Sequence, residues 1–294
     1  MEWESVSRIL IFGLSIGCIY ALTAVGLNLL WGTMRVINIS HGSLIMLGGY
    51  AAFWLFTLYN VSTFISAGLA AIGGAVLGLI IYKLLFKSSL RTIKSPEAVE
   101  SFSLLIFFGI LILFQNVASL AWTGNFREYT YLATSVTILG TPLGLNRLLA
   151  SLIAIGVSLG FYFYLEKSLF GKAVRAVIQD NDAAKLVGVN IDKVYMFCFG
   201  AGFAMAGLAG ALLSMLYALE PYMGLPYTLT ALVVIILGGM GNILGSLIGG
   251  LVLGLIITTG VALTSPVFSF VILYLLFILV ILFLPAGILG RRLR

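Results

Sequence analysis

The chain has 294 residues, of which 61% are hydrophobic and only 9% are charged, and its mean hydropathy is +1.16. Soluble domains carry about 25% charged residues, so this composition excludes a water-soluble protein and indicates one that crosses a membrane several times. The formal net charge of +6 does not predict a nucleic-acid partner, because most of the basic residues flank apolar segments, as membrane topology requires.

Long apolar segments follow one another along the chain. They are continuous and lack the two-residue alternation of a membrane β-barrel. Each therefore predicts a helix of about 20 residues that spans the membrane. The segment 227–262 is too long for one crossing. It contains Gly238-Gly239-Met240-Gly241-Asn242, which predicts a break into two helices. We expect one all-α domain over residues 1–294, a polytopic membrane protein with about 8–9 transmembrane helices, some of them broken or re-entrant. The segments are 8–31, 43–59, 62–82, 99–121, 147–165, 194–218, 227–262 and 267–285.

Lysine and arginine are concentrated in three stretches that connect or follow these segments. Basic residues favour the cytoplasmic side, so we expect all three stretches there, and the N-terminus and the connection 122–146 on the outside. An even number of crossings must then separate the loop at about 166–193 from the C-terminus, which again requires the break within 227–262. The basic residues concerned are Lys83, Lys87, Arg91, Lys94, Lys167, Lys172, Arg175, Lys185, Lys193, Arg291, Arg292 and Arg294.

Residues 171–190 form a polar stretch between two apolar spans. Ala173, Val174, Ala176, Val177 and Ile178 would give one apolar face to a first short helix. A second short helix over 182–187 would be capped by Asp180 or Asn181 and would end at Gly188. A loop lying on anionic lipid is one interpretation. The mixture of acidic and basic residues favours the other, a cytoplasmic surface that docks onto a partner protein.

His41 is the only histidine and lies between the first two spans, beside Ser40 and Asn38, which are candidate helix caps. It could brace a re-entrant turn or line a pathway; a lone histidine without a carboxylate cluster does not predict a metal site. Between residues 194 and 290 the only charged residue is Glu220. This argues against a transporter that moves protons through membrane carboxylates. Asn28 and Asn116 could line a route for a polar, uncharged group.

The sequence predicts no enzyme and no bound cofactor. Gly171-Lys172 is followed by Ala173 and lacks the upstream glycine of a P-loop, and no Ser/His/Asp or Cys/His set has suitable spacing. Glycines at spacings of three to five residues, Gly202, Gly207 and Gly210 in one span and Gly245, Gly249, Gly250 and Gly254 in another, predict close helix packing in lipid.

A short internal repeat relates the two halves of the chain. Gly42-Ser43-Leu44-Ile45 recurs as Gly245-Ser246-Leu247-Ile248, and each copy follows an asparagine, Asn38 or Asn242. Broken helices at matching positions in two halves point to the substrate path of a transporter.

Five motifs together resemble the H-type permeases of bacterial branched-chain amino-acid ABC importers. They are Gly-Leu-Asn-Leu-Leu-Trp-Gly (26–32), Asn-Ile-Ser-His-Gly (38–42), the polar stretch 171–190, Leu-Gly-Gly-Met-Gly-Asn-Ile-Leu-Gly (237–245) and Leu-Pro-Ala-Gly-Ile-Leu-Gly (284–290). The resemblance implies a bacterial or archaeal cytoplasmic (inner) membrane protein. It also implies a second, different permease chain, two cytoplasmic ATPase subunits that hydrolyse ATP, and an extracytoplasmic solute-binding protein.

The resemblance assigns an ATPase-coupling role to the polar stretch 171–190. The coupling residues would be Gly171, Lys172, Arg175, Asp180, Asp182, Ala183, Ala184 and Gly188. The broken helices and the polar side chains at membrane depth, rather than the resemblance, predict the translocation path. That path would include Asn28, Asn38, His41, Gly42, Asn116, Gly239, Gly241, Asn242 and Gly245.

Two departures from the family pattern concern the substrate. Ser43 stands where the family commonly has an acidic residue, and the connection 122–146 is short. Related permeases carry urea, other amino acids, nucleosides or sugars. The expected function is import of branched-chain or other hydrophobic amino acids; the alternative is a stand-alone channel or facilitator for a small neutral solute such as urea.

Overall fold

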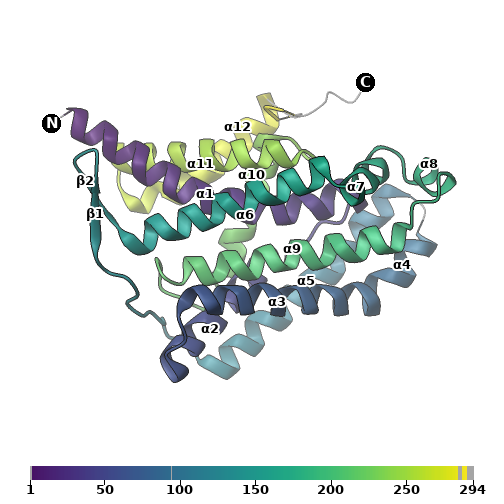
Figure 1. The fold of residues 1–294 in the computed structure, drawn as a ribbon, viewed down its shortest axis with the longest axis horizontal. Helices are drawn as coiled ribbons and strands as arrows, with labels where there is room; N and C mark the ends of the chain where they lie inside the picture. Colours follow the sequence, from purple (N-terminus) through teal and green to yellow (C-terminus); the bar gives the residue numbers. More distant parts are fainter. Residues whose placement is uncertain (1, 94, 284–286, 290–294) are drawn as a thin grey trace.

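The structure is a computed structural model that describes residues 2–93, 95–283 and 287–289 (Figure 1). It confirms the all-α membrane fold. Among the described residues, seven helices are long and apolar enough to cross a membrane, and two shorter apolar helices join them. Of the motif at 284–290 only residues 287–289 are described, and the basic residues Arg291, Arg292 and Arg294 lie outside the described residues. The helices in chain order are α1 (Glu2–Met34), α2 (His41–Tyr59), α3 (Thr63–Ile81), a π-helical turn (Tyr82–Phe86), α4 (Lys87–Thr92), α5 (Pro96–Trp122), α6 (Leu145–Lys167), α7 (Leu169–Gln179), α8 (Asn181–Leu186), α9 (Ile191–Leu213), α10 (Gly224–Gly238), α11 (Ile243–Leu263), a 3-10 turn (Pro266–Phe268) and α12 (Ser269–Phe283).

The predicted break within 227–262 is confirmed. Gly239 and Gly241 have φ angles of 109° and 82°, in the left-handed region that favours glycine, and they reverse the chain between α10 and α11. A Cβ on Gly238 would lie 2.1 Å from the carbonyl oxygen of Gly245, so only glycine allows the two helices to leave the turn this closely. The predicted span 194–218 was too long. α9 ends at Leu213, and residues 214–216 form a turn in which the amide of Leu216 donates to the Leu213 carbonyl oxygen at 2.9 Å, three residues back instead of four.

The glycine-rich spans pack as predicted. A Cβ on Gly250 would lie 2.5 Å from the backbone nitrogen of Ala21 in α1, and a Cβ on Gly202 would lie 2.7 Å from the carbonyl oxygen of Gly26. Close approach of this kind replaces hydrophobic burial as the source of helix association in lipid. α1, α2 and α9 consequently form the buried centre of the bundle, whereas only 28%, 22% and 28% of the most apolar windows of α3, α5 and α6 are buried.

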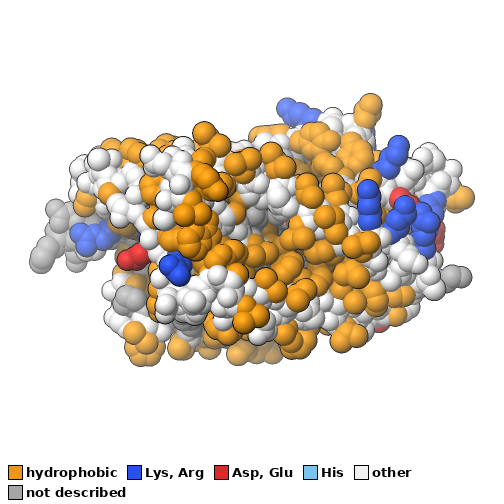
Figure 2. Space-filling model, turned by 90° about the horizontal axis from the view of Figure 1, so that it is seen from below, with side chains coloured by type: hydrophobic (Ala, Val, Ile, Leu, Met, Phe, Trp, Pro, Cys, Tyr) orange, Lys and Arg blue, Asp and Glu red, His pale blue; other side chains and the backbone are white. Residues whose placement is uncertain are grey.

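The two ends of the bundle differ in character. A small antiparallel hairpin, β1 (Ser135–Ile138) with β2 (Thr141–Gly144), lies near the N-terminus, and α7 and α8 lie at the opposite end (Figure 1). Hydrophobic side chains cover much of the surface between these ends, and Lys and Arg side chains gather at the α7–α8 end (Figure 2). The positive-inside rule makes this basic end cytoplasmic.

Candidate functional site

The first candidate region joins α1 to the turn between α10 and α11. Asn28 is buried; its Oδ1 accepts a hydrogen bond from Gly241 N at 2.7 Å, and its Nδ2 donates to Ser246 Oγ at 2.7 Å and to the Asn242 carbonyl at 2.9 Å. Asn242 in turn caps α11, because its Oδ1 accepts from Gly245 N at 3.0 Å. The structure therefore brings Asn28 together with the predicted residues Gly239, Gly241, Asn242 and Gly245.

The second region is the start of α2, inside the bundle. His41 is fully buried, and its Nε2 lies 2.9 Å from the Thr23 carbonyl oxygen of α1. Ser40 occupies the N-cap position but makes no side-chain capping bond; its hydroxyl donates instead to Asn38 Oδ1 at 2.8 Å. Ser40 is thus the N-cap by position, as predicted, but the side chain that accepts a hydrogen bond from the first turn is that of Thr228 in α10, which accepts from Gly42 N at 2.8 Å.

The N-termini of α2 and α10 meet in this second region. A Cβ on Gly42 would lie 1.7 Å from the Gly224 carbonyl oxygen, so the first turns of the two helices are in direct contact. Within the described residues, Asn38 Nδ2, His41 Nδ1 and Ser43 Oγ are buried without a hydrogen-bond partner. The result is a polar junction enclosed by an apolar bundle, an arrangement that is costly in lipid.

The short repeat has a structural counterpart. Its first copy begins α2 and packs through Gly42 on the first residue of α10, whereas its second copy begins α11 and packs through Gly245 on the last residue of α10. α10 is therefore held at both ends by matching glycines. Asn116 belongs to neither region: it is exposed on α5, and its Nδ2 donates to the Ile112 carbonyl of its own helix at 2.8 Å.

The third region is the segment 166–193 at the basic end of the bundle, where the two predicted short helices, α7 and α8, are present. Val174 and Val177 of α7 are buried against the bundle. Of the two candidate caps for α8, Asp180 is the one used, since its Oδ1 accepts from Asp182 N at 2.9 Å and from Ala183 N at 3.0 Å. Gly188, with φ 86°, ends the second helix as predicted.

Arg175 is directed toward α6 rather than toward the solvent. Its guanidinium donates to the Leu165 carbonyl oxygen, to Glu166 Oε2 at 3.2 Å and to the Glu166 carbonyl oxygen at 3.1 Å. A cation at the C-terminal carbonyls of a helix is favourable. A Cβ on Gly171 would lie 1.9 Å from the Leu165 carbonyl oxygen, so this glycine permits the same contact between α6 and α7. Both residues hold the segment in place.

The outer surface of the segment carries residues that the sequence reasoning overlooked. Leu186 and Val187, here called the α8 tip, are 89% and 78% exposed although they lie outside the hydrocarbon. Lys172, Asp182, Ala183 and Lys185 are also exposed, and Lys185 Nζ pairs with Asp182 Oδ1 at 3.0 Å. The available signal was an apolar pair directly before the helix-ending Gly188. Large exposed apolar side chains next to charged ones are typical of a protein-docking surface.

Asp192 connects the end of this segment to α4. Its carboxylate accepts a hydrogen bond from Arg91, lies 3.9 Å from Lys87 Nζ, and accepts from the Tyr82 hydroxyl at 3.3 Å. All of these partners lie beyond the last residue of α3, and Asp192 lies in the first turn of α9. A displacement of the segment 166–193 would therefore be transmitted both to α9 and, through α4, to α3.

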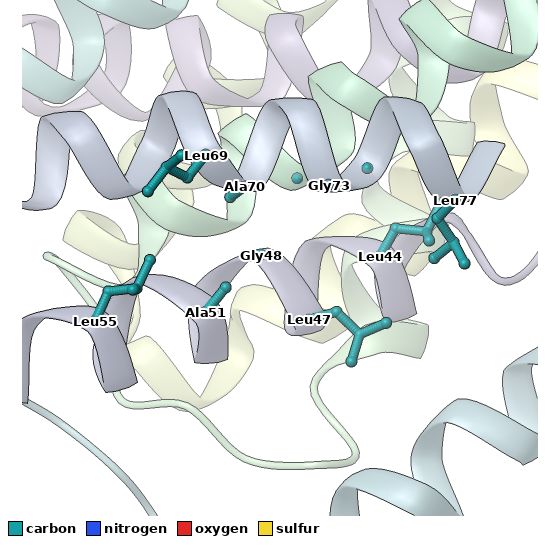
Figure 3. Close-up of a pocket in the computed structure, with 11 residues that line it drawn as sticks. Leu44, Leu47, Gly48, Ala51, Leu55, Leu69, Ala70, Gly73 and Leu77 are labelled. Atoms are coloured by element: carbon teal, nitrogen blue, oxygen red, sulfur yellow. The ribbon is translucent and has the colours of Figure 1, made fainter. Parts of the chain in front are cut away.

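An apolar pocket of about 260 Å³ lies between α2 and α3 (Figure 3). Its lining consists of leucine, alanine and glycine residues, among them Leu44, Leu47, Ala51, Leu69 and Gly73. Such a lining suits an acyl chain or a neighbouring helix. It contains no side chain that could recognise a polar solute.

Comparison with known proteins gives a consistent result. The family model described as the permease component of the branched-chain amino acid transport system matches residues 9–281. The chain is 31% identical to the high-affinity branched-chain amino acid transport system permease protein LivH of Salmonella typhimurium over 288 residues, which cover 95% of this chain and 94% of that protein. It is 29% identical to the corresponding permease protein BraD of Pseudomonas aeruginosa, covering 96% of this chain and 95% of the relative. No solved structure matches the chain.

Proposed function

The chain belongs to the family of branched-chain amino acid transport system permease components, and we propose that it imports branched-chain or other hydrophobic amino acids as the membrane-spanning subunit of an ATP-driven importer. In this proposal the chain itself binds no ATP. Two cytoplasmic ATPase subunits hydrolyse it, a second and different permease chain completes the membrane part, and an extracytoplasmic binding protein delivers the solute.

The observation that carries the coupling role is the exposed α8 tip on the basic, cytoplasmic end of the bundle. Leu186 and Val187 would enter a groove of an ATPase subunit, and a few desolvated apolar anchors can supply most of the energy of such an interface. Lys172, Asp182, Ala183 and Lys185 would surround them. Gly171, Arg175, Asp180, Ala184 and Gly188 would keep the segment in the shape that presents the tip.

The contacts behind the tip suggest how motion is transmitted. α7 is anchored to the bundle by Val174 and Val177, and Asn181 Nδ2 donates to the Tyr195 hydroxyl of α9 at 2.6 Å. Closure of the ATPases would displace α8 and, with it, α9. Through Asp192 the movement would also reach α4 and the preceding helix α3. Rigid-body movement of packed helices is an established way to switch access between two sides of a membrane.

The path would run where the helices are broken. The buried junction of α2 and α10, with Asn38, His41 and Gly42, lies at the point where two helices start inside the bundle, which is typical of substrate sites in transporters. The turn held by Asn28 would keep α10 and α11 together as one moving unit.

The test is to purify the tagged chain in mild detergent and identify what accompanies it. We expect an ATPase subunit and a second permease, with ATP hydrolysis that rises when a leucine-loaded binding protein is added. A chain that purifies alone and conducts urea or another neutral solute in liposomes would contradict the importer and support the stand-alone facilitator.

A further inference from the structure

A second and larger cavity, of about 930 Å³, lies at the end of the bundle opposite α7 and α8. Its walls come from the N-terminal half of α1, the start of α6, the turn before α10 and the first turns of α10, the end of α11 and the start of α12. Most of the lining is apolar, including Phe12, Ile16, Ile257 and Leu273, with Tyr20, Tyr227 and Thr230 among the polar groups. Cavities of about 300–1,000 Å³ with an apolar wall and few polar groups are typical of small-molecule sites.

Arg147 contributes a positive charge to this cavity, and no carboxylate among the described residues forms an ion pair with it. It lies in the first turn of α6, where the helix dipole disfavours a cation, so helix stability does not explain it. Its guanidinium carbon lies 5.1 Å from the ring centre of Phe12 and 5.8 Å from that of Tyr217. Within the described residues the guanidinium forms no ion pair or hydrogen bond, so its planar array of donors is available to a carboxylate.

Glu220 contributes the opposite charge to the same cavity. It is half-buried in the turn before α10 and is the only charged residue between positions 194 and 290. Arg147 and Glu220 do not pair with each other, so each is available to a group of the ligand. A cavity that places Arg147 and Glu220 beside an apolar wall fits a ligand that has an anionic group, a cationic group and a hydrocarbon side chain.

We propose that this cavity binds an apolar amino acid as its zwitterion, with the carboxylate on Arg147, the ammonium facing Glu220 and the side chain against Phe12, Ile16 and Leu273. This rests on the proposed function and places a solute site within this chain on the outer side. Arg8 at the rim adds a second positive charge that would attract the carboxylate. A phospholipid phosphate would also meet the arginines, but it would be repelled by Glu220.

The test measures occupancy directly. Ala262 lines the cavity and is exposed. In a chain whose two cysteines, Cys18 and Cys198, are replaced by alanine, Ala262→Cys provides a single target for a maleimide. With the complete transporter in phosphatidylcholine nanodiscs, leucine should slow alkylation, whereas leucinol, which lacks the carboxylate, and 4-methylpentanoate, which lacks the ammonium, should not.

Charge variants separate the two recognition groups. Arg147→Gln should raise the leucine concentration needed for half-maximal protection about tenfold or more. Arg147→Lys should have a smaller effect, because lysine keeps the positive charge but cannot donate two parallel hydrogen bonds to the carboxylate as the guanidinium does. Glu220→Gln should weaken protection by leucine and admit 4-methylpentanoate. The matched control is Glu128→Gln, a glutamate on the same outer side that is absent from the cavity lining. Unchanged alkylation in the absence of leucine shows that a variant is folded.

Several results would overturn the proposal. Equal protection in the parent chain and in Arg147→Gln would do so, and so would the absence of any protection by leucine. Slower alkylation that depends on anionic lipid rather than on leucine would assign the cavity to a lipid headgroup. ATP hydrolysis, measured in parallel, distinguishes failure of this site from failure of the importer proposal. If leucine-loaded binding protein stimulates ATP hydrolysis but leucine does not slow alkylation, only this site is refuted. If leucine slows alkylation but no ATP hydrolysis is coupled to the chain, the importer is refuted.

Discussion

Asn28 Oδ1 accepts a hydrogen bond from the backbone N–H of Gly241 at 2.7 Å, which joins two residues 213 positions apart in the chain. The same side chain donates to Ser246 Oγ and to the Asn242 carbonyl oxygen. One buried amide thus pairs with the Gly241 N–H and the Asn242 carbonyl oxygen of the glycine turn. α1 is thereby fixed to the hairpin of α10 and α11.

Asn28→Leu should destabilise the protein by about 2 kcal/mol, because it leaves the Gly241 amide and the hydroxyl of Ser246 without their partner. The measurement is the thermal unfolding midpoint of the detergent-purified chain, followed by size-exclusion chromatography. Asn116→Leu is the matched control, since Asn116 is exposed and bonds only within its own helix. Equal midpoints for the two variants would contradict the role given to Asn28.

Gly250→Ala should be destabilising by about 1–3 kcal/mol, because the added methyl group would lie 2.5 Å from the backbone nitrogen of Ala21 and would force α1 and α11 apart. Gly156→Ala in α6 should have the opposite sign, a gain of about 0.5 kcal/mol or more, because no atom lies within 4 Å of its Cβ position and alanine favours a helix. The two unfolding midpoints should move in opposite directions. A loss of stability in both would show that close packing is not the reason for the difference.

Arg175→Gln should loosen α7 from α6, because the guanidinium holds the Leu165 and Glu166 carbonyl oxygens. Hydrogen exchange of the backbone amides in 169–179 should become faster. Lys172→Gln, on the exposed side of the same helix, should leave exchange unchanged. If the amides of 169–179 exchanged at the same rate in the two variants, Arg175 would not hold α7 on α6. It would then be available for docking, as the sequence resemblance implied.

Much of this architecture follows from local sequence signals. The break at Gly238–Asn242 was predictable because segment length and the parity of basic residues both required it. α7 and α8 were predictable because Asp180 and Gly188 are strong end signals. The side-chain contact that caps α2 was not, because the amide of Gly42 is bonded to Thr228, 186 residues away. The exposure of Asn116 was not predictable either, since α5 is apolar on nearly every face and the sequence does not indicate which face turns outward.

The connection through Asp192 should matter for coupling more than for stability. Its partner Arg91 is 63% exposed, and exposed ion pairs contribute only about 0–1 kcal/mol. Asp192→Arg places a cation in the first turn of α9 beside Lys87, so it should lower the stability by about 1–2 kcal/mol at most, but it should clearly raise the number of ATP molecules hydrolysed per amino acid imported. The charge swap Asp192→Arg with Arg91→Asp should restore part of the coupling. Full restoration is not expected, because Lys87 and Tyr82 also contact the carboxylate. No rescue at all would refute the connection.

The most direct test of the importer proposal is ATPase recovery after the α8 tip is made acidic. Leu186→Asp with Val187→Asp should lower the amount of ATPase that co-purifies with the chain about tenfold or more and abolish uptake, while the chain remains folded. Leu139→Asp, which replaces an 81% exposed leucine in the outer β-hairpin, should leave ATPase recovery unchanged. Wild-type ATPase recovery and uptake in the double variant would contradict the docking of α8.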